Sequence, residues 1–198
     1  MVQTLNNALR RVPPLAIYIV GALPLLWLVW LAVNGGLGAD PVKALEHQLG
    51  KWGLQLMVAV MLVTPLRRLT AINLIRYRRA LGLLAFFYIV LHLVVWVTLD
   101  LQFRWAEIWA DLIKRPYIMA GMAGFAVMIP LAVTSNNASI RKLGPKTWQN
   151  LHRLTYFAAI AGAVHYLWLV KAWPPEPIIY LILMIFLVMT RLIPRSAR

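Results

Sequence analysis

The sequence predicts an all-α integral membrane protein, a bundle of six transmembrane helices with both termini in the cytoplasm. Composition is the first reason, because 62% of the 198 residues are hydrophobic, the mean hydropathy is +0.72 and only 13% are charged. A soluble domain carries roughly 25% charged residues. The second reason is that the charges divide the chain into long apolar stretches, and the third is that basic residues concentrate in alternate connections.

Six apolar stretches are candidates for spanning helices, because a helix needs about 20 residues to cross the hydrocarbon core. The second reaches that length only by including Leu49, Gly50 and the aliphatic stem of Lys51. The sixth contains Glu176 near one end and Arg191 near the other. We expect one transmembrane domain over residues 1–198, with helices at about 12–33, 49–66, 80–99, 117–134, 151–170 and 175–193.

The distribution of charge predicts the orientation, because cytoplasmic loops carry an excess of lysine and arginine. With the amino terminus inside, the inner segments hold 14 of the 20 basic residues: Arg10, Arg11, Arg67, Arg68, Arg76, Arg78, Arg79, Arg141, Lys142, Lys146, Arg153, Arg191, Arg195 and Arg198. The outer connections hold the other basic residues, Lys43, Lys51, Arg104, Lys114, Arg115 and Lys171. They also hold all six acids, Asp40, Glu46, Asp100, Glu107, Asp111 and Glu176.

Several kinds of chemistry are excluded by what the sequence lacks. With no cysteine, the chain cannot form disulfides, use a thiolate nucleophile, hold a Cys-ligated iron–sulfur cluster or Cys-type zinc site, or attach haem covalently through a C-x-x-C-H motif. It has no glycine-rich phosphate loop and no H-E-x-x-H motif. No carboxylate lies in the core of a predicted helix, which disfavours a proton-coupled transporter.

Two histidines, His92 and His165, fall at equal depth in the third and fifth predicted helices. Counted from Arg79 and Arg153 at the inner boundary, they lie about 19.5 Å and about 18 Å along their helices. An ionisable residue inside the membrane indicates a functional site, and histidine is a usual axial ligand of haem iron. We therefore expect the two rings to hold one b-type haem between them.

His152 is predicted to have a different role, because it lies about 19.5 Å from His165 along the same predicted helix and cannot bind the same iron. Two interpretations are open. It is either a histidine that hydrogen-bonds locally at the inner boundary, or part of a second haem, flavin or quinone site. The fourth histidine, His47, is expected to be solvated. Gly82, Gly121, Gly124 and Gly162 fit either a slot for a cofactor or ordinary packing between helices.

Several longer motifs together resemble a known family: NGGLGADPVKALEHQLGKWGL, TPLRR, IRYRRALGLLAFFYIVLH, RPYIMAGMAGF, LAVTSN and RKLGPKTWQNLHRLTYFAAIAGAVHYLW. The chain is similar to the haem-binding membrane subunits of bacterial protein-methionine-sulfoxide reductase systems, within the ferric-reductase-like transmembrane superfamily. The family's haem histidines fall on His92, His152 and His165.

The resemblance implies a multi-pass protein of the bacterial inner membrane that carries b-type haem, one or two, and FMN. It implies an electron-transfer subunit rather than the catalytic one. Electrons would come from the quinone pool or a cytosolic flavin reductase. They would pass to a periplasmic molybdopterin enzyme that reduces methionine sulfoxide in oxidised proteins. A stand-alone ferric reductase is the alternative that keeps the haem, and a small transporter with a histidine proton relay is the alternative from another class.

One departure from the wider superfamily concerns the inner level. Members with two haems place two histidines on each of two helices, whereas here the positions 14 and 13 residues before His92 are Arg78 and Arg79. Either His152 then binds a haem without a matching histidine, or the basic pocket of Arg78 and Arg79 holds a propionate, a flavin phosphate or a quinone.

Overall fold

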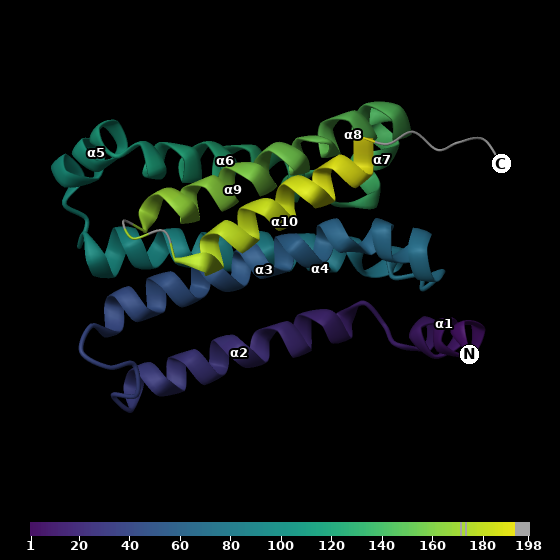
Figure 1. The fold of residues 1–198 in the computed structure, drawn as a ribbon, viewed down its shortest axis with the longest axis horizontal. Coiled ribbons are helices and arrows are strands. Elements are labelled where there is room, and N and C mark those ends of the chain that lie inside the picture. The colour runs from purple at the N-terminus through teal and green to yellow at the C-terminus, as the bar shows by residue number, and fades with distance from the viewer. Residues whose placement is uncertain (171, 173, 193–198) are drawn as a thin grey trace.

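The computed structural model describes residues 1–170, 172 and 174–192, and every regular element in these ranges is a helix. Figure 1 shows six long helices running lengthwise in a bundle: α2 (Leu15–Val33), α3 (Pro41–Thr70), α4 (Arg78–Val95), α6 (Pro116–Val133), α9 (Leu154–Leu169) and α10 (Pro175–Leu192). Four segments are long and apolar enough to cross a membrane: Leu15–Val33, Pro41–Thr70, Ile75–Asp100 and Pro116–Val133. The all-α membrane fold is therefore confirmed, while the count of six spans stays a prediction.

The helix boundaries differ from the predicted ones in two places that matter for the site. Helix α3 begins at Pro41, well before the predicted 49, because Asp40 accepts a hydrogen bond from the Lys43 backbone N–H and proline is favourable in a first turn. The predicted helix 151–170 is broken, since α8 (Pro145–His152) ends where α9 is about to begin. His152 therefore does not lie on the same helix as His165.

Short helices that the apolar pattern did not predict lie at the two ends of the bundle. They are α1 (Val2–Arg11), the 3-10 turn η1 (Ile75–Tyr77), α5 (Trp105–Lys114), α7 (Asn137–Leu143) and α8. Beyond Val95, α4 continues in a π-helical turn, η2 (Trp96–Asp100).

Two helix pairs, α3 with α4 and α6 with α9, pack most closely, and α10 covers the seam between α9 and α3. Their shared core is built from small and flexible apolar side chains, including Met57, Met61, Ala85, Ala159 and Met184. Helix α2 runs along one edge (Figure 1) and leaves most of its apolar side chains exposed, as a lipid-facing helix does. A hydrogen bond of 2.5 Å from the Tyr88 hydroxyl to the Gly21 carbonyl ties it to α4.

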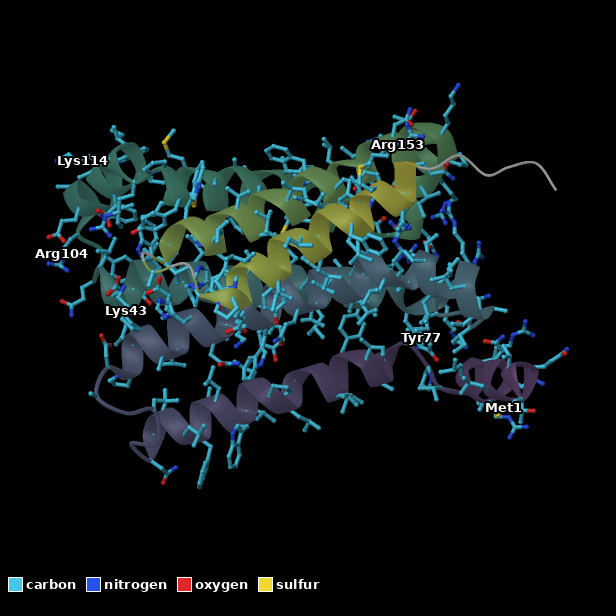
Figure 2. The ribbon with its side chains drawn as sticks, viewed as in Figure 1. Met1, Lys43, Tyr77, Arg104, Lys114 and Arg153 are labelled. Atoms are coloured by element: carbon cyan, nitrogen blue, oxygen red, sulfur yellow. The ribbon has the colours of Figure 1, made fainter. Side chains whose placement is uncertain are left out.

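The two ends of the bundle differ in charge, as Figure 2 shows. One, here called the mixed-charge end, holds all five ion pairs among the described residues: Lys43–Glu46, Lys43–Asp100, Lys51–Glu176, Arg104–Glu107 and Arg115–Asp111. The other, the basic end, carries Arg153 and the arginines around Tyr77. Hydrogen bonds from Tyr77 to the Leu9 carbonyl (2.5 Å) and from Arg68 to the Thr190 carbonyl (2.8 Å) place α1 and the end of α10 there. Lys171, Arg195 and Arg198 lie outside the described residues, and the assignment of the basic end to the cytoplasm stays a prediction.

Helix α5 has two adjoining apolar faces. Ile108, only 6% exposed, packs against Trp96, Leu101 and Ile118. Trp105, Trp109 and Ile113, spaced four residues apart on the neighbouring face, are 61%, 64% and 75% exposed. Because α5 lies between spans that end at Asp100 and begin at Pro116, it stays at the membrane boundary.

We expect the exposed apolar face of α5 to lie in the interfacial layer of the bilayer, where tryptophan is favoured, with Glu107, whose side chain is 51% exposed, toward water. The natural chain has no cysteine, so single spin labels can be attached through Trp109→Cys and, as the matched control, Glu107→Cys. In lipid nanodiscs, the label at 109 should be more accessible to oxygen than to a polar nickel chelate, and the label at 107 should show the opposite. Equal accessibility of both labels to the chelate would contradict an interfacial position.

Candidate functional site

The imidazoles of His92 and His165 are held in the same way on different helices. Nδ1 of His92, on α4, lies 2.8 Å from the carbonyl oxygen of Glu46 on α3. Nδ1 of His165, on α9, lies 2.7 Å from the carbonyl oxygen of Tyr117 on α6. A carbonyl only accepts, so each Nδ1 carries the proton and donates it. Each neutral ring is thereby left with the Nε2 lone pair, the form that binds a metal.

The structure brings these two rings together. Their centroids are 6.1 Å apart and their planes are inclined by 74°. Both rings line a cavity of about 660 Å³ between α3, α4, α6 and α9, within the usual range for cofactor sites. Two imidazoles that share one metal through bonds of about 2.0–2.1 Å have centroids roughly 6.3 Å apart. The observed separation therefore suits a common metal ion.

The two histidine nitrogens suit a metal ion whose other ligands come from a cofactor rather than from the protein. Among the described residues, no group of three or more histidine, aspartate and glutamate side chains could hold a metal ion. Two nitrogens are too few for a protein-only zinc site, which uses three or four protein ligands. A planar macrocycle that supplies four nitrogens leaves two opposite positions for histidine. The arrangement can hold such a group and carry single electrons.

A charged network adjoins His92 at the mixed-charge end. The Glu46 side chain, 9% exposed, is the one buried charged residue among the described positions. Its carboxylate accepts from Lys43 Nζ at 3.1 Å, and Lys43 also bonds Asp100 at 2.7 Å. Asp100 is the last residue of the π-helical turn that continues the helix of His92. Lys43 thus links Glu46, whose carbonyl accepts from His92, to Asp100 at the end of the helix that carries His92. His47 is exposed, as predicted.

His152 lies at the basic end and is already hydrogen-bonded. The Thr134 hydroxyl donates to the Pro130 carbonyl at 2.7 Å and so accepts from His152 Nε2 at 3.1 Å. The Trp148 ring stacks on the imidazole, with centroids 3.8 Å apart. Burial above all, and then Arg78 and Arg79, lower the pKa of His152, so its ring is neutral at neutral pH. The local hydrogen bond of the first interpretation is therefore present, and a further cofactor site at His152 stays a prediction.

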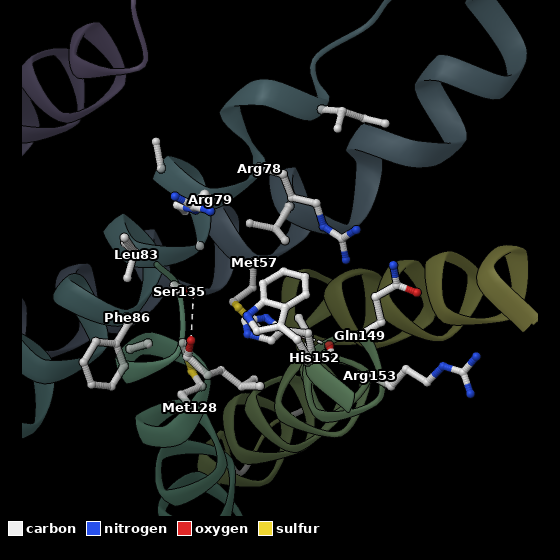
Figure 3. A pocket seen from close by; sticks show the side chains of 18 of the residues that line it. Met57, Arg78, Arg79, Leu83, Phe86, Met128, Ser135, Gln149, His152 and Arg153 are labelled. Atoms are coloured by element: carbon white, nitrogen blue, oxygen red, sulfur yellow. Dashed lines mark hydrogen bonds between the residues drawn. The ribbon is translucent and has the colours of Figure 1, made fainter. Parts of the chain in front are cut away.

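A second cavity, of about 760 Å³, opens beside His152 (Figure 3). Arg78, Arg79, Gln149 and Arg153 line it, so the residue 14 positions before His92 does lie at the level of His152. Arg79 donates to the Asn137 side chain at 2.8 Å. The Arg78 side chain makes no hydrogen bond or ion pair within the part of the chain that the structure describes. Since all six acids lie at the mixed-charge end, this cavity is suited to an anion.

Another arginine at the same end donates a hydrogen bond that the backbone of α3 cannot supply. Pro65 has no N–H, so the Met61 carbonyl lacks its helical partner. Nη2 of Arg191, on α10, donates to that carbonyl at 2.8 Å and to the Val60 carbonyl at 3.3 Å. The Nε atom of Arg191 is buried without a partner among the described residues. The sequence had suggested only a boundary charge at this position.

Sequence reasoning also missed two glycines on α3. It singled out Gly121 and Gly124 on α6, but Gly50 and Gly53 stand in the same relation to His92 and its helix. The signal that could have found them is a repeated Gly-x-x-Gly, GKWG and GMAG, placed on the helix before each histidine helix.

Comparison with known proteins places the chain in a family. The family described as ferric reductase like transmembrane component matches residues 49–163, which include His92 and His152 and end just before His165. The chain belongs to this family. It is a multi-pass membrane protein.

Similar full-length relatives carry a more specific name. Proteins of Brucella ovis, Brucella canis and Brucella suis, each named "Protein-methionine-sulfoxide reductase heme-binding subunit MsrQ", are 48% identical over 176 residues. The match covers 89% of this chain and 80% of each relative. The resemblance expected from the motifs is thereby confirmed. No solved structure matches the chain.

Proposed function

We propose that this protein is the haem-binding electron-transfer subunit of a methionine sulfoxide reductase system, with His92 and His165 as the axial ligands of one b-type haem. The observation that carries the proposal is the pair of neutral imidazoles 6.1 Å apart across an intramembrane cavity. The names of relatives at 48% identity support it. A haem with two histidine ligands supplies one-electron transfer without an open coordination position.

The chain's own residues account for the binding and the tuning of such a group. The carbonyls of Glu46 and Tyr117 fix the tautomer of each imidazole and raise the basicity of its Nε2 atom. Apolar side chains, among them Met57, Ile89 and Met128, make up most of the cavity surface and would limit the access of water to a bound group. Water exclusion and the nearby Glu46 and Lys43 charges would both influence the reduction potential.

We further propose that the cavity at the basic end receives the electron donor or an anionic part of a cofactor. Arg78 and Arg79 would bind the propionate of a haem, the phosphate of FMN or a quinone. His152 is the weaker third candidate for an axial ligand, because its Nε2 already bonds Thr134 and Arg78 stands where a partner histidine would be.

The proposed direction of electron flow rests on the family resemblance, and the predicted topology assigns each partner to one end of the bundle. Quinol or a cytosolic flavin reductase would donate at the basic end, facing the cytoplasm of the bacterial inner membrane. A periplasmic molybdopterin-dependent methionine sulfoxide reductase would accept at the mixed-charge end. The protein would then serve the repair of oxidised periplasmic proteins without itself being the catalytic subunit.

Haem and flavin quantification on the purified protein tests this function. We expect about one b-type haem per chain, with oxidation of the reduced protein by a molybdopterin methionine sulfoxide reductase that has its substrate. Chelated ferric iron as the preferred acceptor would instead favour a stand-alone ferric reductase. A colourless, iron-free protein that folds normally would contradict the proposal and favour a transporter.

A further inference from the structure

We infer that Gly50 and Gly121 are positioning residues for His92 and His165. The same local arrangement of histidine, carbonyl and glycine occurs twice in the site, once for each histidine. In each copy, the imidazole lies over one helical turn of a neighbouring helix. It donates to a carbonyl at position i and rests against a glycine at position i+4. The inference rests on the proposed role of the two histidines as haem ligands.

The first copy lies between α3 and α4. His92 donates to the Glu46 carbonyl, and Gly50 follows four residues later on the same face of α3. A Cβ atom at Gly50 would lie 3.1 Å from Nδ1 and 3.2 Å from Cε1 of His92. One turn on, a Cβ at Gly53 would overlap Cδ1 of Ile89, the residue three positions before His92.

The second copy lies between α6 and α9, with tighter contacts at the histidine. His165 donates to the Tyr117 carbonyl, and Gly121 follows four residues later. A Cβ atom at Gly121 would lie 2.7 Å from Nδ1 and 3.1 Å from Cε1 of His165. A Cβ at Gly124 would lie 3.2 Å from the Cβ of Ala161, four positions before His165. Both copies therefore have the order Gly-x-x-Gly helix, then histidine helix.

The physical reason for glycine is that the ring and a side chain at position i+4 compete for one volume. A helical carbonyl can accept a second hydrogen bond only if the donor approaches from beside the turn, above the residue at i+4. A methyl group at position i+4 would displace the imidazole, lengthen its Nδ1 hydrogen bond and change the direction in which the Nε2 lone pair points. Glycine is costly in a helix interior, yet it occurs at both equivalent positions, and this repetition supports the inference. Gly82, also on α4, is the contrast, because a Cβ atom there would meet no neighbouring atom within 4 Å.

The test compares Gly121→Ala, Gly50→Ala and the control Gly82→Ala in the full chain. The readouts are haem per chain, the low-spin signature of two histidine ligands by electron paramagnetic resonance, and the helix content of the apoprotein. Overpacking of a tight contact predicts haem binding about tenfold weaker or more in Gly121→Ala. Because its contacts are longer, Gly50→Ala should lose less. Gly82 lines the basic-end cavity but does not touch His92 or His165, so Gly82→Ala should keep the low-spin signal of the His92–His165 haem.

Free imidazole separates positioning from general damage to the fold. If the methyl group at 121 displaces His165, added imidazole should restore the low-spin signature in Gly121→Ala. Natural haem content and an unchanged low-spin signal in both Gly121→Ala and Gly50→Ala would overturn the inference. Equal losses in Gly82→Ala would overturn it as well. If the natural protein binds no haem at all, the proposed function itself fails, and this result is distinct from the two outcomes that overturn the inference.

Discussion

Replacing either His92 or His165 by alanine should abolish the low-spin b-type spectrum of the purified protein. Each imidazole supplies one side of a pair whose centroids are 6.1 Å apart, so removal of one leaves the iron with a single protein ligand. Loss of either ligand should also empty most of the site during purification, because non-covalent binding is the only mode open to a chain without cysteine. Absorption spectra and haem quantification on both variants measure the effect.

Two matched variants make this result specific. His152→Ala removes a histidine that bonds Thr134 and stacks on Trp148, and it should keep the spectrum of the His92–His165 haem. His47→Ala removes an exposed histidine that also lines the cavity of His92 and His165, and it should keep the spectrum because His47 is not one of the paired rings. Unchanged spectra in both His92→Ala and His165→Ala would contradict the assignment of these two histidines as the haem ligands. Loss of a distinct second haem only in His152→Ala would show that the basic-end cavity is a haem site.

The histidine pair was predictable because helix geometry converts residue counts into depth. His92 and His165 each follow an arginine at the membrane boundary by nearly the same number of residues, and the spans run in the same direction. The same arithmetic placed Arg78 at the level of His152, and both line one cavity. The length of the uncharged apolar stretches likewise predicted the long helices, since lipid requires every backbone group to be satisfied within its own segment.

What the sequence could not predict depends on which face each helix presents to its neighbours. Gly50 looks like any glycine near a helix end until α4 is placed against it, when it proves to lie under His92. The carbonyls of Glu46 and Tyr117 carry no sequence signal, because every residue has one. The break between α8 and α9 at His152 also escaped, since the apolar pattern continues across it while the backbone does not.

Replacing Arg191 by leucine should destabilise the bundle, by about 1–3 kcal/mol, because it leaves the Met61 carbonyl buried without a donor. Pro65 cannot supply the helical hydrogen bond to that carbonyl, and Arg191 from α10 does so at 2.8 Å. Leucine keeps the apolar volume of the arginine stem, so the loss would come from the polar contact. Thermal unfolding of the protein in lipid nanodiscs measures the change.

A double-mutant cycle identifies the cause, because Pro65→Ala restores the missing N–H within α3. If Arg191 serves the carbonyl that proline leaves unpaired, Arg191→Leu should cost clearly less in the Pro65→Ala background than in the natural one. Arg68→Leu is the control, since Arg68 donates to the Thr190 carbonyl and has no connection with Pro65. Its cost should be the same in both backgrounds. An equal cost of Arg191→Leu with and without Pro65 would mean that Arg191 does not stabilise the bundle through the carbonyl that Pro65 leaves unpaired.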